Sequence, residues 1–217
     1  MVFIHIMHRV ANHDFQTGEP VKLTRSTLMR NFQLQRPARY HAEALRRTEH
    51  LRSEHLREAA VLIGFIERDS GLNVLFTRRA MHLRHHPGQV SFPGGKKETD
   101  DLSVYHTAIR ETFEETGIRP DQIEIFGHLP ELATISRFAV TPVLAFIDQD
   151  YQLTIDKNEV DEAFEVPADY VFSKTNLFTQ TFQIKDTAHR IFAIPYQHHF
   201  IWGMTAQIIQ AMQKQIA

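Results

Sequence analysis

The feature that most constrains the fold is an uninterrupted apolar run from Ala59 to Ile66. A short run of this kind, bounded by turn residues, is typical of a buried strand. The turn cluster at 68–71 follows it, and Leu72 to Thr77 has the composition of a second strand. We therefore expect a β-hairpin whose first strand lies in the interior of a sheet.

The rest of the chain combines further strands with few helices. Pro37 divides a helix-like segment at 21–58, and Gly117 should end a central helix over 102–116 because glycine favours the position after a last helical turn. We expect strands near 89–92, 123–126 and 140–147, a short helix at 159–165, a late hairpin at 181–184 and 190–194, and a C-terminal helix at 201–213. This order predicts the α+β class, with an α/β/α sandwich built on a mixed sheet.

Length and composition exclude several classes of protein. A chain of 217 residues forms one domain, which we place at 21–217 behind a flexible extension at 1–20. Since it has no cysteine, disulfide scaffolds, thiol nucleophiles and Cys-ligated metal sites are excluded. No segment reaches the roughly 18 apolar residues of a transmembrane helix, and the apolar N-terminal run is too short for a signal peptide. We expect a cytoplasmic protein without a membrane partner.

The net charge of −2 excludes an overall basic field, so we expect no nucleic-acid partner. The charges are nevertheless segregated, with a balance of +5 at 68–97 and of −6 at 98–124. The segment 21–58 is also basic, which fits either a solvated helical face or the capture of an anionic ligand. A basic stretch that leads into an acidic helix suits a metal-assisted phosphate enzyme, because arginines hold phosphate oxygens and carboxylates hold the cations that bridge to them.

Glu111, Glu114 and Glu115 converge over one turn of the central helix. A group of residues that includes Leu102, Tyr105 and Phe113 falls on nearly the opposite side. The glutamates fit a solvated face or a set of oxygen ligands for Mg²⁺ or Mn²⁺. Upstream, Phe92-Pro93-Gly94-Gly95 offers paired glycines, which permit close backbone approach.

These residues together resemble the Nudix box, G-x5-E-x7-R-E-U-x-E-E-x-G-U, with Gly95 at its start, Arg110-Glu111 and Glu114-Glu115 in its helix and Gly117 at its end. Gly95 and Arg110 lie fifteen residues apart, one more than in the standard box, and Thr112 replaces an apolar residue. The coenzyme A pyrophosphatase subgroup has this longer loop. Its upstream signature, L-x-T-x-R-[SA]-x3-R-x3-G-x3-F-P-G-G, is met at every fixed position from Leu75 to Gly95.

The resemblance implies a Nudix-type sandwich with a loop-helix-loop catalytic motif. Glu111, Glu114 and Glu115 would bind Mg²⁺ or Mn²⁺, and the Gly95 carbonyl could join them. Arg110 would orient a ligating carboxylate, and the earlier acidic position falls to Asp101 or Glu98. Glu114, Glu159 and Arg110 are the expected catalytic residues, whereas Arg79, Arg84 and Gly94 are expected at the substrate.

Alternatives stay open for several of these residues. Glu159 is an extra metal ligand or general base, with Glu162 as second choice, unless the acidic segment 148–169 is only a solvated loop. Arg79 and Arg84 would otherwise form structural ion pairs. His82, His85 and His86 fit a surface or phosphate-contacting role better than a zinc site, and Trp202 fits core packing better than an adenine platform.

The activity that the resemblance implies is hydrolysis of the diphosphate of coenzyme A, or of acyl or oxidised coenzyme A, to 4′-phosphopantetheine and adenosine 3′,5′-bisphosphate. Two alternatives remain, a Nudix pyrophosphatase for another nucleotide diphosphate such as NADH or ADP-ribose, and a non-catalytic Nudix-fold module. The partner is in each case a small molecule, and a homodimer is compatible with the sequence.

Overall fold

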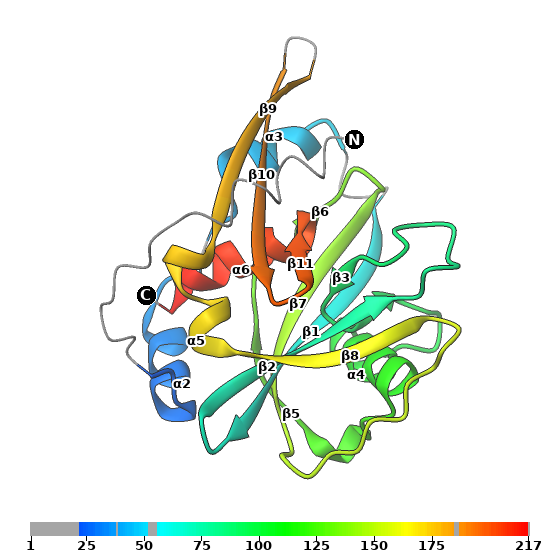
Figure 1. Cartoon of the computed structure of the whole chain (residues 1–217). Coiled ribbons are helices and arrows are strands. Elements are labelled where there is room, and N and C mark those ends of the chain that lie inside the picture. Colours follow the sequence, from blue (N-terminus) through cyan, green and yellow to red (C-terminus); the bar gives the residue numbers. More distant parts are fainter. Residues whose placement is uncertain (1–21, 38, 52–55, 185–186, 217) are drawn as a thin grey trace.

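The computed structural model describes residues 22–37, 39–51, 56–184 and 187–216. Its main sheet is built around β1 (Arg57–Arg68), which pairs in parallel with β7 (Phe138–Ile147) and antiparallel with β2 (Gly71–Arg79). The strand order is β3-β2-β1-β7-β5, with β3 at Val90–Ser91 and β5 at Ile123–His128 (Figure 1). Three further strands join this mixed sheet: β4 (Gly94–Lys96) on β1, β6 (Leu132–Ala133) on β7 and β8 (Val160–Pro167) on β2.

The apolar run in β1 exists because both faces of this strand are covered. Ile63 and Phe65 belong to a core cluster that includes Met212 of α6 (Gly203–Gln215). Leu62 belongs to a second cluster that includes Ala108 of α4 (Val104–Thr116). Alternate residues therefore enter different cores, and a polar residue on either face would be buried.

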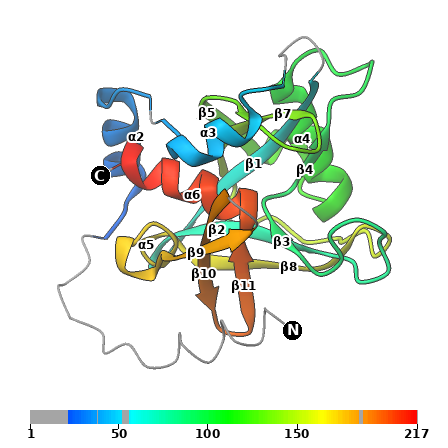
Figure 2. The same cartoon turned by 90° about the horizontal axis from the view of Figure 1, so that it is seen from above.

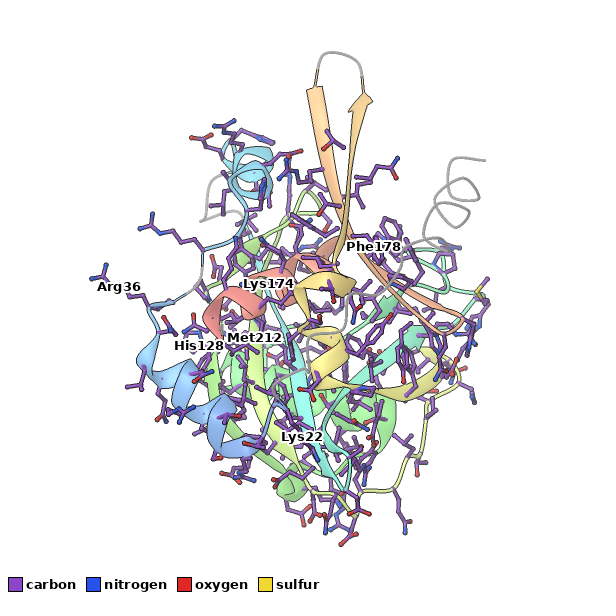
Figure 3. All side chains as sticks on the ribbon, turned by 60° about the vertical axis from the view of Figure 1, so that its left-hand side comes forward. Lys22, Arg36, His128, Lys174, Phe178 and Met212 are labelled. Carbon is purple, nitrogen blue, oxygen red and sulfur yellow. The ribbon has the colours of Figure 1, made fainter. Side chains whose placement is uncertain are left out.

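The helices form the outer layers of the expected sandwich. Figure 2 shows α4 on the side of β1 and β7 opposite to α6, with α2 (Arg25–Leu34) and α3 (Ala42–Thr48) on the α6 side. The side chain of Met212 lies inside the α6 layer, whereas Arg36 projects from the surface (Figure 3). A second, three-stranded sheet of β9 (Phe178–Ile184), β10 (Thr187–Tyr196) and β11 (His199–Trp202) leads into α6. The described residues also include the short helical turns η2 (Pro120–Gln122), α5 (Ala168–Val171) and η3 (Lys174–Asn176).

Most expected elements are confirmed. The segment 21–58 holds α2 and α3 on either side of Pro37, and the late hairpin is β9–β10. Gly117 ends α4 in the left-handed conformation, with φ of 75°, while Ser103 caps its start by accepting a hydrogen bond from the His106 backbone. The expected flexibility of 1–20 lies outside the described residues.

Among the described residues, none of the helices combines the length and apolar character needed to cross a bilayer.

The expected helix at 159–165 is wrong, because this segment forms β8. Its residues pair antiparallel with β2, with Phe164 opposite Phe76 and Val166 opposite Val74. Phe164 and Val166 pack in the same core cluster, whereas Ala163, which precedes Phe164, packs against the other one. Pairing along the edge of β2 and this alternating burial outweighed the local helical tendency.

Only part of the helix side that holds Leu102, Tyr105, Thr112, Phe113 and Thr116 meets the sheet. Leu102 is 92% exposed and Phe113 46%, whereas Thr112 and Thr116 are fully buried. Each threonine hydroxyl donates to the carbonyl four residues earlier, Thr112 to Ala108 at 2.7 Å and Thr116 to Thr112 at 2.6 Å. Small side chains with internally satisfied hydroxyls let the helix lie close to β1 and β4, at the cost of leaving larger residues outside.

This packing predicts unequal costs for two phenylalanines. Phe65 is fully buried among aromatic rings, so Phe65→Ala should lower the free energy of unfolding by about 3–5 kcal/mol. Phe113→Ala, in the exposed face of α4, should lower it by less than about 1 kcal/mol. Urea denaturation followed by circular dichroism measures both. A loss at Phe113 as large as that at Phe65 would contradict the orientation of α4.

Candidate active site

Three carboxylates from two segments meet at one end of α4. Glu111 and Glu115 come from the helix, and Glu159 comes from the loop that precedes β8. One oxygen of each lies within 4.8 Å of the other two. Glu115 is buried, with 3% exposure, the Glu111 side chain is 12% exposed, and Glu159 is exposed to solvent. The resemblance to the Nudix family implied a carboxylate from this later loop, with a solvated acidic loop as the alternative, and the structure brings Glu159 to the helix glutamates.

The two glycines of β4 allow the helix to approach this closely. Gly94 and Gly95 pair with Val61 and Ala60 of β1. A Cβ on Gly95 would lie 2.4 Å from the carboxyl carbon of Glu111, and Gly94 has φ of 151°, where a Cβ would lie 2.3 Å from the Ala60 carbonyl oxygen. Only a residue without a side chain fits at Gly95 while Glu111 keeps its position.

Arg110 holds the helix carboxylates through a buried anchor. Its guanidinium donates from Nε and Nη2 to the two oxygens of Asp101, at 3.0 and 2.9 Å, and Asp101 is 6% exposed. Asp101 also accepts from the Thr107 hydroxyl and the Glu98 backbone, and the hydrogen bonds from Arg110 hold the pKa of Asp101 well below its usual range. The structure thus places Asp101, and not the exposed side chain of Glu98, at the site.

The same arginine orients Glu111 and Glu114. Arg110 donates to Oε1 of Glu111 at 3.1 Å and to Oε2 of Glu114 at 2.7 Å. Glu114 is 51% exposed and is not one of the three converging carboxylates. The three glutamates of the helix therefore point in two directions. Glu111 and Glu115 face the loop that carries Glu159, whereas Glu114 lies against Arg110.

Burial makes the carboxylate group electrostatically unfavourable without a cation. Burial raises the pKa of Glu115 from 4.5 to about 8, and the charges of Glu111 and Glu159 act in the same direction. Arg79 and the Thr77 hydroxyl, which donates to Glu115 at 3.3 Å, only partly oppose this shift. Burial also raises the pKa of Glu111, against the effect of Arg110. Hard oxygen donors with excess negative charge fit Mg²⁺ or Mn²⁺.

A cavity of about 630 Å³ lies beside this group. Gly94, Gly95 and Arg79 line it on the side of the carboxylates, and Trp202 and Met204 line it on the side of α6. Trp202 is half-buried at the cavity wall, which corrects its expected place in the core. The sequence favoured core packing for Trp202, because the place of β11 at this cavity depends on contacts between distant segments.

Two other expected groups lie apart from the carboxylates. Arg84 is exposed and does not line the cavity, and His82 and His85 are exposed with it. Glu162, the second choice for the general base, points to the other face of the sheet, where Arg78 lies 3.3 Å from its Oε2. It therefore does not join Glu159.

The comparisons with known proteins agree with this geometry. The NUDIX domain model matches residues 55–185, which contain the carboxylates, Arg110 and both glycines. The chain belongs to the Nudix family. It is 38% identical over 194 residues to "Uncharacterized Nudix hydrolase NudL" of Enterobacter sp. (strain 638), covering 89% of this chain and 95% of that protein. The protein of the same name from Pectobacterium atrosepticum is 40% identical over 161 residues, covering 74% and 83%.

Solved structures of Nudix hydrolases also match parts of the chain at low identity. RenU, a Nudix hydrolase from M. smegmatis, matches with a TM-score of 0.46 and 22% identity over 53% of this chain and 73% of that one. The binary complex of the C. elegans Ap4A hydrolase matches with a TM-score of 0.45 and 20% identity over 51% and 80%. Nudix hydrolases use divalent metal ions, and the carboxylate set described above can hold one.

The Arg110 anchor predicts a sharp difference between two acidic residues of the Nudix loop. Asp101→Asn leaves Arg110 buried with a weakened partner, so it should lower the free energy of unfolding by about 3 kcal/mol. The matched control Glu98→Gln changes an exposed side chain and should stay within about 0.5 kcal/mol. Urea denaturation of both variants decides between the two positions, and equal losses would contradict the assignment of the anchor to Asp101.

The buried Glu115 predicts how the stability of the metal-free protein depends on pH. Between pH 4.5 and about 8 the folded state keeps a proton on Glu115 that the unfolded state has lost, so the free energy of unfolding should fall as pH rises through this window. Glu115→Gln should weaken this fall, and the exposed control Glu131→Gln should retain it. Urea denaturation in the presence of a chelator measures it, and identical pH profiles for wild type and Glu115→Gln would refute the prediction.

Proposed function

We propose that this Nudix hydrolase cleaves the diphosphate of coenzyme A, or of its acyl or oxidised forms, with Mg²⁺ or Mn²⁺. The observation that carries the proposal is the meeting of Glu111, Glu115 and Glu159 beside a cavity whose wall contains Arg79. The three carboxylates supply ligands for the metal ion, the Arg79 guanidinium supplies a positive charge for phosphate oxygens, and the cavity gives space for the rest of the substrate.

Each residue has a defined part in the proposed hydrolysis. Glu111 and Glu115 hold the divalent ion, which when bound polarises a phosphoryl oxygen and lowers the pKa of a water molecule. Arg110 fixes the direction of Glu111 through its own bonds to Asp101. The Gly95 backbone lies against Glu111, and its carbonyl is the proposed further ligand.

Glu159 is the proposed general base because it is the exposed member of the group, open to water. It accepts a proton as the water oxygen attacks one phosphorus atom in line and the bond to the bridging oxygen breaks. Arg79 binds phosphate oxygens, and Gly94 permits the backbone to approach them. The products are 4′-phosphopantetheine and adenosine 3′,5′-bisphosphate.

Two of the expected residues have a smaller part. Glu114 would have to leave Arg110 before it could bind the ion, so we assign it to holding the guanidinium in place. Arg84 is exposed and outside the cavity, which leaves it available for the 3′-phosphate on the ribose of coenzyme A.

The choice of coenzyme A over other nucleotide diphosphates rests on two supports. The upstream signature from Leu75 to Gly95 resembles that of the coenzyme A pyrophosphatase subgroup. The cavity wall also contains Ile135, Phe138, Trp202 and Met204, an apolar lining that suits a flexible pantetheine or acyl chain better than a second nucleoside. NADH and ADP-ribose remain the competing substrates.

A substrate panel tests this proposal. Coenzyme A, acyl coenzyme A, NADH and ADP-ribose are each incubated with the protein and Mg²⁺ or Mn²⁺, and the products are identified by mass. We expect turnover of coenzyme A or its acyl form, with a mass matching 4′-phosphopantetheine or its acyl derivative. Turnover of NADH alone would overturn the substrate, and turnover of none would favour a non-catalytic module.

The same assay tests the metal ligands. Glu115→Gln removes a buried charged ligand and should lower kcat by about 10³-fold, which corresponds to the several kcal/mol that a bound ion contributes to the transition state. The exposed Glu131→Gln is the matched control. Unchanged metal-dependent turnover in Glu115→Gln would contradict the ligand assignment even if coenzyme A is the substrate.

A further inference from the structure

A second group of potential ligands lies on the face of the sheet opposite to the three glutamates. Nε2 of His199 lies 3.5 Å from Oε1 of Glu162, and Nε2 of His198 lies 4.0 Å from the same oxygen. One ligand atom of each residue lies within 4.8 Å of the others. Two imidazole nitrogens thus face one carboxylate oxygen.

The spacing of these atoms is compatible with a shared ion. Both separations are longer than the 2.7–3.2 Å or so of a good N–H···O bond. A tetrahedral Zn²⁺ with bonds of about 2.0–2.1 Å places its ligand atoms about 3.3–3.4 Å apart. The His199 pair is close to that separation already, and His198 needs only a small rotation in its exposed loop.

The fold holds two of the three side chains firmly. His199 is 5% exposed, and its ring stacks on Phe164 with centroids 3.7 Å apart and an angle of 5° between planes. Arg78 lies 3.3 Å from Oε2 of Glu162, which leaves Oε1 directed at the imidazoles.

His198 is presented by a two-residue loop. Tyr196 pairs with His199, so Gln197 and His198 form the turn between β10 and β11. Gln197 has φ of 52°, a left-handed conformation that costs a residue with a side chain about 1 kcal/mol. This turn brings His198 next to His199, with ring centroids 3.9 Å apart.

There is also space beside the group for further ligands. A cavity of about 260 Å³ is lined by Arg78, His198, His199 and Trp202, among others. Water or another small ligand could enter it and complete the coordination that three protein side chains leave open. Trp202 also lines the larger cavity at the catalytic carboxylates, so the two spaces share one wall.

We propose that Glu162, His198 and His199 bind a divalent transition metal such as Zn²⁺ at a site separate from the catalytic carboxylates. Its donor set contains two nitrogens and one oxygen, which suits Zn²⁺, Co²⁺ or Ni²⁺ and discriminates against Mg²⁺. A metal here would tie the β10–β11 turn to β8, next to Trp202. The proposal is independent of the substrate of the hydrolase.

Equilibrium dialysis of the full chain, stripped of metal and then supplied with Zn²⁺ in excess Mg²⁺, tests this site. The excess Mg²⁺ occupies the oxygen ligands of the catalytic group and leaves the nitrogen-containing site for Zn²⁺. We expect wild type to bind one equivalent of Zn²⁺, and we expect this binding to require the His198 side chain. His198→Gln and Glu162→Gln should each weaken it at least about 10-fold.

Matched variants separate this site from the other ligands of the chain. His85→Gln removes an exposed histidine outside the group, and Glu115→Gln removes a catalytic carboxylate, and both should bind Zn²⁺ as wild type does. Circular dichroism of the metal-free variants checks that each is folded. The proposal would be overturned if wild type bound no Zn²⁺, or if wild type, His198→Gln and Glu162→Gln bound it equally. Loss of Zn²⁺ binding in Glu115→Gln would also contradict it, because that result would place the ion at the catalytic carboxylates.

Discussion

The bidentate contact between Arg110 and Asp101 is the interaction on which the catalytic end of the molecule depends. Arg110 would otherwise be a free cation on a helix crowded with glutamates. Held by a buried Asp101, it is fixed in place and can contact Glu111, Glu114 and the Lys96 carbonyl at the same time. The charge of Arg110 thereby offsets the repulsion between Glu111 and Glu114 on the same helix.

The glycines and threonines around this contact follow from the same requirement. Glu111 can lie against β4 only because Gly95 has no side chain, and α4 can approach the sheet only because small residues face it. Close approach buries Glu115, and burial raises its pKa. The concentration of negative charge that a divalent ion would offset is therefore a consequence of helix packing as much as of residue identity.

The sequence predicted the parts of the fold and of the site that depend on local pattern. The apolar run of β1, the Gly117 stop and the convergence of Glu111 with Glu115 are properties of adjacent residues, and each is found in the structure. The sequence did not predict β8, whose conformation depends on pairing with β2. It also left Asp101 and Glu98 undecided, because only burial in the folded loop distinguishes them. Trp202 was missed for the same reason, since its position at the cavity depends on contacts between distant segments.

The alternation of side chains along β2 explains how one sheet can carry two chemically different groups. Arg79 faces α4, where its charge acts on Glu115, whereas its neighbour Arg78 faces the opposite side and pairs with Glu162. The first group contains only carboxylate oxygens, and the second contains two imidazoles. Since hard cations prefer oxygen and borderline metals accept nitrogen, the two faces differ in the ion they favour even though the sheet that separates them is a single layer.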